Sequence, residues 1–287
     1  MNNQPLVSVI MNCYNSDKYL KEAIASVIVQ TYENWEIIFW DNQSTDESAK
    51  ILKSYDDKRI KYYYAPKHTL LGEARNLAVD KAKGEWLGIL DCDDVWYADK
   101  LELQLYNIKD DVGMVYTRSE FLIENSGKES YMSKNIKSNM YPKRAELPFG
   151  DIFNELLYDC FIPLPSVLIR KDLFFKVKGI NNNLKVAEDY DIFLRIAKVS
   201  NVNSIDKILC KYRVHSNNLS HTSLDVTFEE SIALVSAYEY HPNINNYIIY
   251  WKMKYIKKML KEKEFTKIFS QLLTMNPIII IKLLISK

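Results

Sequence analysis

The chain of 287 residues lacks a paired-cysteine motif, a strong net charge and a long apolar run, and each absence excludes a class of protein. No two of its four cysteines form a Cys-x-x-Cys pair, which argues against a zinc site or a disulfide framework. A formal net charge of +1 gives no indication of a nucleic-acid partner. The longest apolar run, 278–285, contains Lys282 and is shorter than the ~20 residues that span a bilayer.

The sequence also has only 7 glycines and no basic segment followed by an apolar segment at its N-terminus. A signal peptide is therefore not expected, and reduced thiols in a cytoplasmic protein are the simplest interpretation of the cysteines. Hydrophobic residues make up 47% of the chain and charged residues 26%, which is typical of a globular protein rather than a disordered one. The length suits one large domain with a small appendage.

The first half of the chain alternates short apolar runs with amphipathic stretches. The apolar runs, which predict strands, are 6–11, 35–40, 60–64, 86–90 and 112–116. The stretches that predict helices are 17–30, a segment opened by the capping-box spacing of Ser44 and Glu47, 72–81 and 98–108. This alternation predicts an α/β fold with a mostly parallel central sheet flanked by helices.

The second half has a weaker pattern. Residues 123–143 are polar and read as an irregular excursion. Helices are predicted at 151–160, 173–177 and 188–198, and strands at 166–170 and 208–214. From about residue 228 the pattern is helical throughout, with Asn276-Pro277 suited to start a last short helix.

Polar side chains gather directly after three of the predicted strands, at 12–15, 41–46 and 91–94. In open parallel sheets, ligands bind beyond the carboxyl ends of the strands. The sequence therefore predicts that three separate segments converge on one crevice.

The segment Asp91-Cys92-Asp93-Asp94 follows a buried strand and is rich in carboxylates. Carboxylates suit Mg²⁺ or Mn²⁺, which use one or two of them and complete their coordination with phosphate and water. Asp91 and Asp93 share one side of an extended segment. The segment is a candidate metal and diphosphate site, and the alternative is an acidic loop in which Asp94 or Asp99 caps the next helix.

Three further candidates each have a structural alternative. Asp41 can accept a hydrogen bond from the imide of a uracil-like base, or it can serve a turn and helix cap. Arg75 can reach a base, ribose or phosphate, or it can be a surface arginine paired with Glu73 or a neighbouring acid. The acids of Glu188-Asp189-Tyr190-Asp191 can supply a general base for an acceptor hydroxyl, or they can compensate a helix dipole.

Taken in order, these segments resemble family two of the glycosyltransferases, which have the A-type glycosyltransferase fold. The segments that carry the resemblance span roughly residues 5 to 220 and are 5–15, 41–46, 72–76, 84–94, 165–170, 179–191 and 212–215. The resemblance implies an inverting enzyme that acts by a single displacement. The residues it implies are Tyr14 and Asn15 in the nucleotide pocket, Asp41 for the base, Arg75 for the nucleotide, Asp91 for the ribose or sugar, Asp93 as metal ligand, His215 at the diphosphate or metal, and Asp189 as catalytic base with Glu188 beside it.

The resemblance divides the chain into residues 1–116, a nucleotide-sugar-binding half, and residues 117–225, an acceptor-binding and catalytic-base half of the same domain. Residues 226–287 form a helical C-terminal appendage without a family motif. The sequence departs from the family pattern at Gln43, where a glycine is common, and at Gly179-Ile180, where a glycine pair is common. The first departure falls in the turn that is expected to contact the base.

We therefore expect transfer of a hexose or N-acetylhexosamine from a nucleoside-diphosphate sugar, with uridine as the expected base, in cell-surface polysaccharide or lipopolysaccharide synthesis. The acceptor is expected to be a hydroxyl of a glycan or a lipid-linked molecule. A nucleotidyltransferase of related fold is the near alternative, although the segment 11–17 lacks the glycine-rich basic loop of that class.

The tail is strongly basic, since residues 251–287 contain nine Lys and two Glu and carry a net charge of +7. A lysine face on the predicted helix suits peripheral contact with the inner face of the cell membrane, or it is a solvated face of an ordinary appendage. The lysines on that face are Lys254, Lys257, Lys258 and Lys261. A non-catalytic membrane-associated binding protein is the second alternative.

Overall fold

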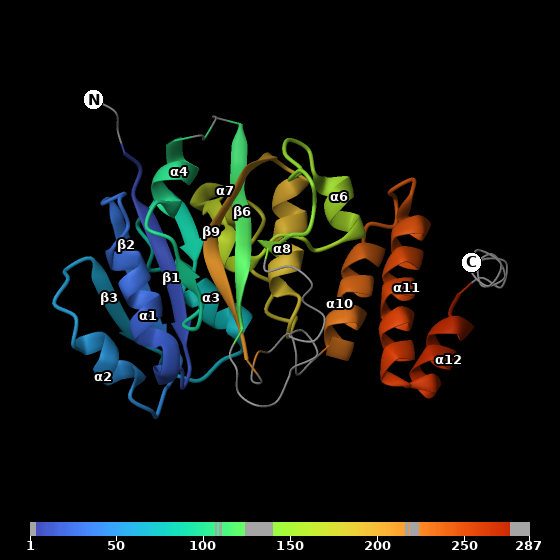
Figure 1. The fold of residues 1–287 in the computed structure, drawn as a ribbon, viewed down its shortest axis with the longest axis horizontal. Coiled ribbons are helices and arrows are strands. Elements are labelled where there is room, and N and C mark those ends of the chain that lie inside the picture. Colours follow the sequence, from blue (N-terminus) through green and yellow to red (C-terminus); the bar gives the residue numbers. More distant parts are fainter. Residues whose placement is uncertain are drawn as a thin grey trace.

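The computed structural model describes residues 4–106, 108, 111–123, 140–215, 218 and 224–275. Within these residues one mixed sheet of nine strands runs through the molecule in the order β3-β2-β1-β4-β8-β6-β9-β5, with β7 beside β6. Figure 1 labels β1, β2, β3, β6 and β9 of this sheet. The strands are β1 (Val7–Cys13), β2 (Trp35–Asp41), β3 (Ile60–Tyr64), β4 (Trp86–Ile89), β5 (Val95–Trp96), β6 (Val112–Ile123), β7 (Met140–Tyr141), β8 (Leu168–Arg170) and β9 (Asn201–Val214).

Strands β1 to β4 form the parallel part of the sheet, with β1 between β2 and β4. Every residue of β2 is buried, which explains why it reads as a continuous apolar run rather than an alternating one. The sequence predicted all four strands to within two residues at each end.

The second half of the sheet is mixed. Strand β8 runs antiparallel to both of its neighbours, β4 and β6, whereas β6 and β9 are parallel and β5 is antiparallel to β9. The predicted α/β fold is thus confirmed, but the parallel arrangement holds for β1 to β4 and for the β6–β9 pair. Strand β9 begins seven residues before the predicted run at 208–214, and β5 and β7 have only two residues each, too few for a periodic signal.

Helices cover both faces of the sheet. They are α1 (Asp17–Ile28), α2 (Ser48–Lys53) and α4 (Lys100–Tyr106) on one face, and α3 (Leu71–Val79), α6 (Phe153–Tyr158), α7 (Lys171–Lys176) and α8 (Glu188–Ala197) on the other. Alternate side chains of β1 enter opposite cores, because Val9 and Met11 pack with α1 while Ile10 packs with α3. The sheet is therefore sandwiched, and only the strand ends remain available for a site.

Three C-terminal helices follow, namely α10 (Leu224–Ser236), α11 (Ile244–Glu262) and α12 (Phe265–Leu273). They stand beside α6 and α8 at the end of the molecule away from β3 (Figure 1). Trp251 of α11 packs on Tyr190 with ring centroids 5.5 Å apart, and its indole N–H donates to the Leu157 carbonyl at 2.9 Å. The appendage thus shares the core of α6 and α8.

The helical prediction for the tail holds as far as the described residues go, and the predicted helix at 276–277 lies outside them. The boundary proposed at 116–117 falls inside β6, and the one at 225–226 falls inside α10. No helix in the described part of the chain combines the length and the apolar character needed to cross a membrane.

Candidate active site

The three polar clusters meet at one edge of the sheet because β1, β2 and β4 are parallel neighbours. The Cys92 thiol donates to the Asn12 carbonyl at 3.2 Å, and the Asn42 N–H donates to the Cys13 carbonyl at 2.8 Å. These contacts link the segments that follow β4, β1 and β2. The convergence expected from strand order is therefore present in the fold.

Arg75 joins two parts of this site that are far apart in sequence. It lies on the buried face of α3, and its side chain is only 3% exposed. Its guanidinium donates from Nη2 to Asp91 Oδ1 and from Nη1 to Glu188 Oε1, both at 2.7 Å. A planar guanidinium can hold two carboxylates at once in fixed directions. Arg75 thus connects the segment after β4 with the start of α8.

The alternative pairing of Arg75 with Glu73 is wrong, because Glu73 faces solvent and pairs with Lys67 at 3.3 Å. Successive helical residues point about 100° apart, so residues two positions apart cannot share a face. The predicted contact between Arg75 and the nucleotide stays a prediction, since two of its nitrogens already bind carboxylates.

Asp189 lies in the first turn of α8 beside Glu188. Burial and, next, the neighbouring Glu188 carboxylate raise the pKa of Asp189, Arg75 opposes the rise, and together they bring it to about 7. A carboxyl with this pKa is about half ionised at pH 7, and its carboxylate form accepts a proton readily, as a general base must.

Asp93 and His215 lie together although they are 122 residues apart in sequence. Asp93 Oδ2 and His215 Nε2 are 2.9 Å apart, and both side chains are partly exposed. Arg213 fixes the backbone of this loop by donating from Nε to the Asp93 carbonyl at 2.7 Å. The pair places one oxygen and one nitrogen donor at a single point.

This pair fits a divalent cation as two adjacent ligands. Ligands ~2.1 Å from Mg²⁺ or a similar ion, at right angles, are separated by about 3 Å. No cluster of three or more His, Cys, Asp or Glu side chains in the described ranges could hold an ion unaided. A cation at Asp93 and His215 therefore needs further oxygens, which a diphosphate and water supply.

Asp94 has a different surrounding from its neighbours. It is buried, its Oδ1 accepts the Arg213 backbone N–H at 2.8 Å, and burial raises the pKa of its carboxyl well above the ordinary value, with Asp93 and Asp91 adding to the rise. Asp94 therefore ties the loop to β9 and does not face the crevice.

Asp41 ends β2 with its side chain fully buried. Its Oδ1 accepts the Ser44 N–H at 2.7 Å, and its Oδ2 accepts the Tyr62 hydroxyl at 2.8 Å. Gln43 has φ +71, so the turn keeps the left-handed conformation that a glycine adopts easily. The expected base contact of Asp41 stays a prediction, and the structure places this carboxylate at the centre of the turn.

The capping box predicted for Ser44 and Glu47 is wrong. Helix α2 begins at Ser48, Glu47 is its N-cap residue, and no side chain caps it there. The Ser44 hydroxyl instead accepts the Asn15 N–H at 3.1 Å. The serine serves the turn between strand ends, which a local capping pattern does not reveal.

Tyr14 and Asn15 follow β1 at the same edge. The Asn15 side chain is used by the fold, because its Oδ1 accepts the Thr45 N–H at 2.8 Å. Tyr14 is 52% exposed, and its ring lies 4.4 Å from that of His68, which follows β3. Sequence reasoning missed His68, although its place after a parallel strand was the available signal.

Comparison with known proteins agrees with this architecture. The model of the family described as glycosyl transferase family 2 matches residues 8–165. An Escherichia coli relative, UDP-Glc:alpha-D-GlcNAc-diphosphoundecaprenol beta-1,3-glucosyltransferase WfgD, is 30% identical over 220 residues, which cover 75% of this chain and 79% of the relative.

Two solved structures share the fold. A crystal structure of S. aureus TarS 1–349 in complex with UDP-GlcNAc has a TM-score of 0.64 at 20% identity, covering 80% of this chain and 65% of that one. The mannosyltransferase PcManGT of Pyrobaculum calidifontis, in complex with GDP-Man and Mn²⁺, has a TM-score of 0.58 at 16% identity, covering 96% and 82%. With the family match across the strand-end clusters, the chain is a member of glycosyl transferase family 2.

Proposed function

We propose that this protein is an inverting glycosyltransferase that moves a hexose or N-acetylhexosamine from a nucleoside-diphosphate sugar to a hydroxyl of a glycan or lipid-linked acceptor. We favour uridine as the base because the E. coli relative is named for UDP-Glc and the TarS crystals hold UDP-GlcNAc. The E. coli relative is also named for a diphosphoundecaprenol acceptor, which supports a role in cell-surface polysaccharide or lipopolysaccharide synthesis.

The observation that carries this proposal is the bridge from Asp91 through Arg75 to Glu188. Asp91 lies at the strand-end crevice, where a donor nucleotide is expected to bind. Glu188 adjoins Asp189, the candidate base. One buried guanidinium therefore fixes the donor side and the acceptor side of the reaction relative to each other, as a displacement between two bound molecules requires.

In the proposed reaction, Asp189 takes the proton of the acceptor hydroxyl while that oxygen attacks the anomeric carbon. The bond from that carbon to the diphosphate breaks as the new bond forms, and the nucleoside diphosphate leaves with the bonding electrons. A single displacement inverts the anomeric configuration. No second carboxylate is needed, because no covalent intermediate forms.

The donor pocket is built from the strand-end segments. Asp93 and His215 would hold Mg²⁺ or Mn²⁺, and such an ion stabilises the charge that develops on the departing diphosphate. Asp91, with a side chain 33% exposed, would bind the ribose or sugar. Tyr14 and His68 would flank the base, and Asn15 and Asp41 would shape that pocket through the turn they hold.

The proposal is tested by assaying a panel of UDP- and GDP-sugars for transfer or hydrolysis with Mn²⁺, Mg²⁺ or EDTA. Turnover is expected with a UDP-sugar and is expected to disappear with EDTA. Asp189→Asn should lower transfer about 10²- to 10⁴-fold, because it removes the base without changing shape. Asp93→Asn should remove metal-dependent turnover.

Asp172→Asn is the matched control, since Asp172 is an exposed acid paired with Arg170 away from the site. It should transfer at the wild-type rate. Near-normal turnover of folded Asp189→Asn would show that another group is the base.

The appendage supports a further part of the proposal, peripheral contact with an anionic membrane. The predicted lysine face is only partly solvated, because Lys254 pairs with Asp159 and Lys258 is 7% exposed against Phe228. Lys257 and Lys261 remain exposed. The large apolar side chains exposed nearby are Leu260, Phe265, Phe269 and Leu273, the last three at helical spacing along α12. Cations beside such a stripe suit an anionic bilayer surface.

Flotation with vesicles of phosphatidylglycerol or of phosphatidylcholine tests this contact. We expect binding to the anionic vesicles, weakened by salt, and at least tenfold weaker binding of the triple variant Phe265→Ser, Phe269→Ser, Leu273→Ser. Tyr106→Ser is the control, because Tyr106 is 87% exposed on α4 in the first half of the chain. Equal flotation of the triple variant and the control would remove the membrane role of α12.

A further inference from the structure

Helix α8 begins with the two acids of the candidate site but lacks a cap of its own. Its N-cap residue is Ala187, whose side chain cannot accept a hydrogen bond, and no side chain caps it there. The first N–H groups of any helix have no partner within the helix. The position of Asp189 therefore depends on what holds the backbone that leads into the helix, in addition to the Arg75–Glu188 pair.

The segment that leads into α8, residues 185–187, is held by the appendage. The Glu230 carboxylate of α10 accepts three successive N–H groups, those of Lys185 at 2.9 Å, Val186 at 3.1 Å and Ala187 at 3.0 Å. Both carboxylate oxygens take part. A negative group at a helix N-terminus is also favoured by the helix dipole.

Glu230 is itself held by a packed helix. The next residue, Ser231, is 2% exposed, and Val235 one turn further is fully buried in the core that also contains α8. On the opposite side of the loop, Asn76 of α3 accepts the Ile180 N–H at 2.9 Å and donates to the Ile180 carbonyl at 2.8 Å. The segment leading into α8 is thus clamped between α3 and α10.

We propose that Glu230 is a positioning residue for sugar transfer, which holds the backbone of residues 185–187 so that Asp189 faces the acceptor hydroxyl. The inference rests on the proposed function, in which Asp189 is the base. Glu230 touches no reacting group and acts through the start of α8. Glu230 belongs to none of the family motifs, because it follows the last segment that carries the family resemblance.

A shift of the base by ~1 Å can cost about 10²-fold in rate, whereas the donor site lies on other elements. We therefore expect Glu230→Ala to lower kcat about 10- to 100-fold while the KM for the donor and the affinity for UDP with Mn²⁺ change less than about twofold. Glu230→Gln keeps one acceptor oxygen and places an amide donor against N–H groups, so a smaller loss of kcat is expected.

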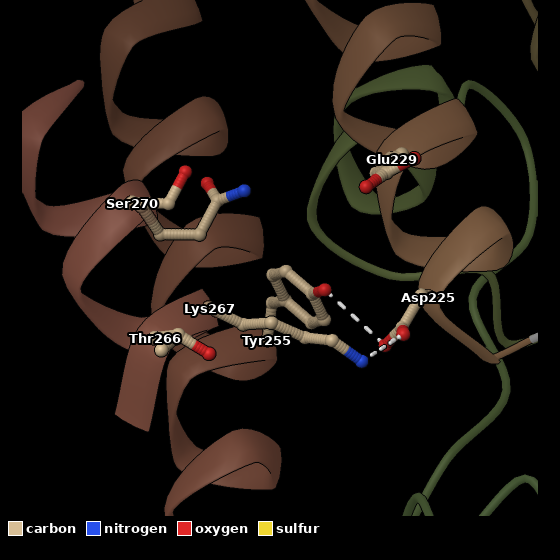
Figure 2. A pocket seen from close by; sticks show the side chains of 7 residues that line it. Asp225, Glu229, Tyr255, Thr266, Lys267 and Ser270 are labelled. Carbon is tan, nitrogen blue, oxygen red and sulfur yellow. Dashed lines mark hydrogen bonds and ion pairs between the residues drawn. The ribbon is translucent and has the colours of Figure 1, made fainter. Parts of the chain in front are cut away.

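Glu229 provides a matched control on the same helix. It is exposed and lines a polar cavity of about 270 Å³ between α10, α11 and α12, on which Asp225, Tyr255 and Lys267 also converge (Figure 2). The Asp225 carboxylate there already binds the Lys267 ammonium at 2.5 Å and the Tyr255 hydroxyl at 3.2 Å. Glu229→Gln should leave kcat and UDP affinity at wild-type values.

Hydrogen exchange gives a readout that does not depend on turnover. The amides of residues 185–187 should exchange faster in Glu230→Ala and Glu230→Gln than in wild type or Glu229→Gln, with UDP binding retained. Wild-type kcat in folded Glu230→Ala would overturn the proposal, and so would equal loss of UDP affinity and kcat. If the wild-type protein transfers no sugar, the proposed function fails. If the amides of residues 185–187 exchange at the same rate in the Glu230 variants as in wild type, Glu230 does not hold this segment.

Discussion

The donor side and the acceptor side of the site are built in different ways. On the donor side, the segments at the ends of β1, β2 and β4 hold one another through short contacts between neighbouring strands, such as the Asn15–Thr45 and Cys92–Asn12 bonds. On the acceptor side, α8 is held by residues from distant parts of the chain, with Arg75 on α3 and Glu230 on α10. The first arrangement is local to each strand end, and the second depends on packing between separate layers.

This difference separates residues whose position follows from the strand that precedes them from residues whose position depends on packing between elements. The position of a donor-side motif such as 91–94 is set by its strand, because the strand order places the motif at the sheet edge. The Glu188 carboxylate is instead held by Arg75 of α3, and the backbone before it is held by Glu230 of α10. Substitutions on the two sides should therefore have different consequences for binding, turnover and stability.

The largest effect is expected at Arg75, which joins the two sides. Arg75→Met leaves the buried Glu188 carboxylate and the Asp91 carboxylate without their shared cation. Breaking a buried ion pair costs roughly 3–5 kcal/mol, so a marked loss of unfolding free energy is expected in denaturant titrations. We also expect about 10²-fold lower kcat/KM, because both the donor and acceptor groups are displaced.

Arg59→Met is the control for Arg75, since Arg59 pairs with Asp57 near the surface of the same half. A pair of that kind contributes about 0–1 kcal/mol. Equal stability of the Arg75 and Arg59 variants would contradict a bridge between the two sides.

The pH dependence of the transfer rate should distinguish the acceptor side from the donor side, because the affinity for UDP should not change with it. In the proposed mechanism Asp189 acts as the carboxylate, and its pKa is raised, chiefly by burial, to about 7. The rate should fall about tenfold per pH unit below pH 7 and level off above it. The affinity for UDP, which is expected to depend on the donor side, should not decrease below pH 7 as the rate does. A pH-independent rate from 5 to 8 would remove the assignment of Asp189.

The raised pKa of Asp189 also links stability to pH. The folded state binds this proton more tightly than the unfolded chain, so the stabilising contribution is present below the ordinary value of 3.8 and is lost as pH rises through about 7. The difference in denaturation midpoint between Asp189→Asn and wild type should therefore shift in favour of the variant when the pH is raised from 4 to 8. A constant difference between the two proteins would count against a buried, ionising Asp189.

The smallest effect is expected within the donor side at Gln43. A non-glycine residue in the left-handed region costs about 1 kcal/mol, so Gln43→Gly should be slightly more stable, by at most that amount, in chemical denaturation. Turnover and UDP affinity should stay at wild-type values because the turn keeps its shape. Altered donor preference would show instead that the Gln43 side chain contacts the base.

Several features could be predicted from local sequence alone. The strands of the parallel half were predictable because strands buried on both faces leave continuous apolar runs. The convergence of 12–15, 41–46 and 91–94 followed from strand polarity. The capping-box prediction at Ser44 and the pairing of Arg75 with Glu73 were wrong, because both residues are used by contacts between elements.

By itself, the sequence determined the α/β class, the edge of the sheet where the donor is expected and the acids that are proposed to carry the chemistry. These depend on periodicity and residue type within a few positions. Only the tertiary structure decided the antiparallel course of β8, the Arg75 bridge and the grip of Glu230 on α8. Such contacts join residues 16 to 113 positions apart, and their geometry follows from how layers pack rather than from any local pattern.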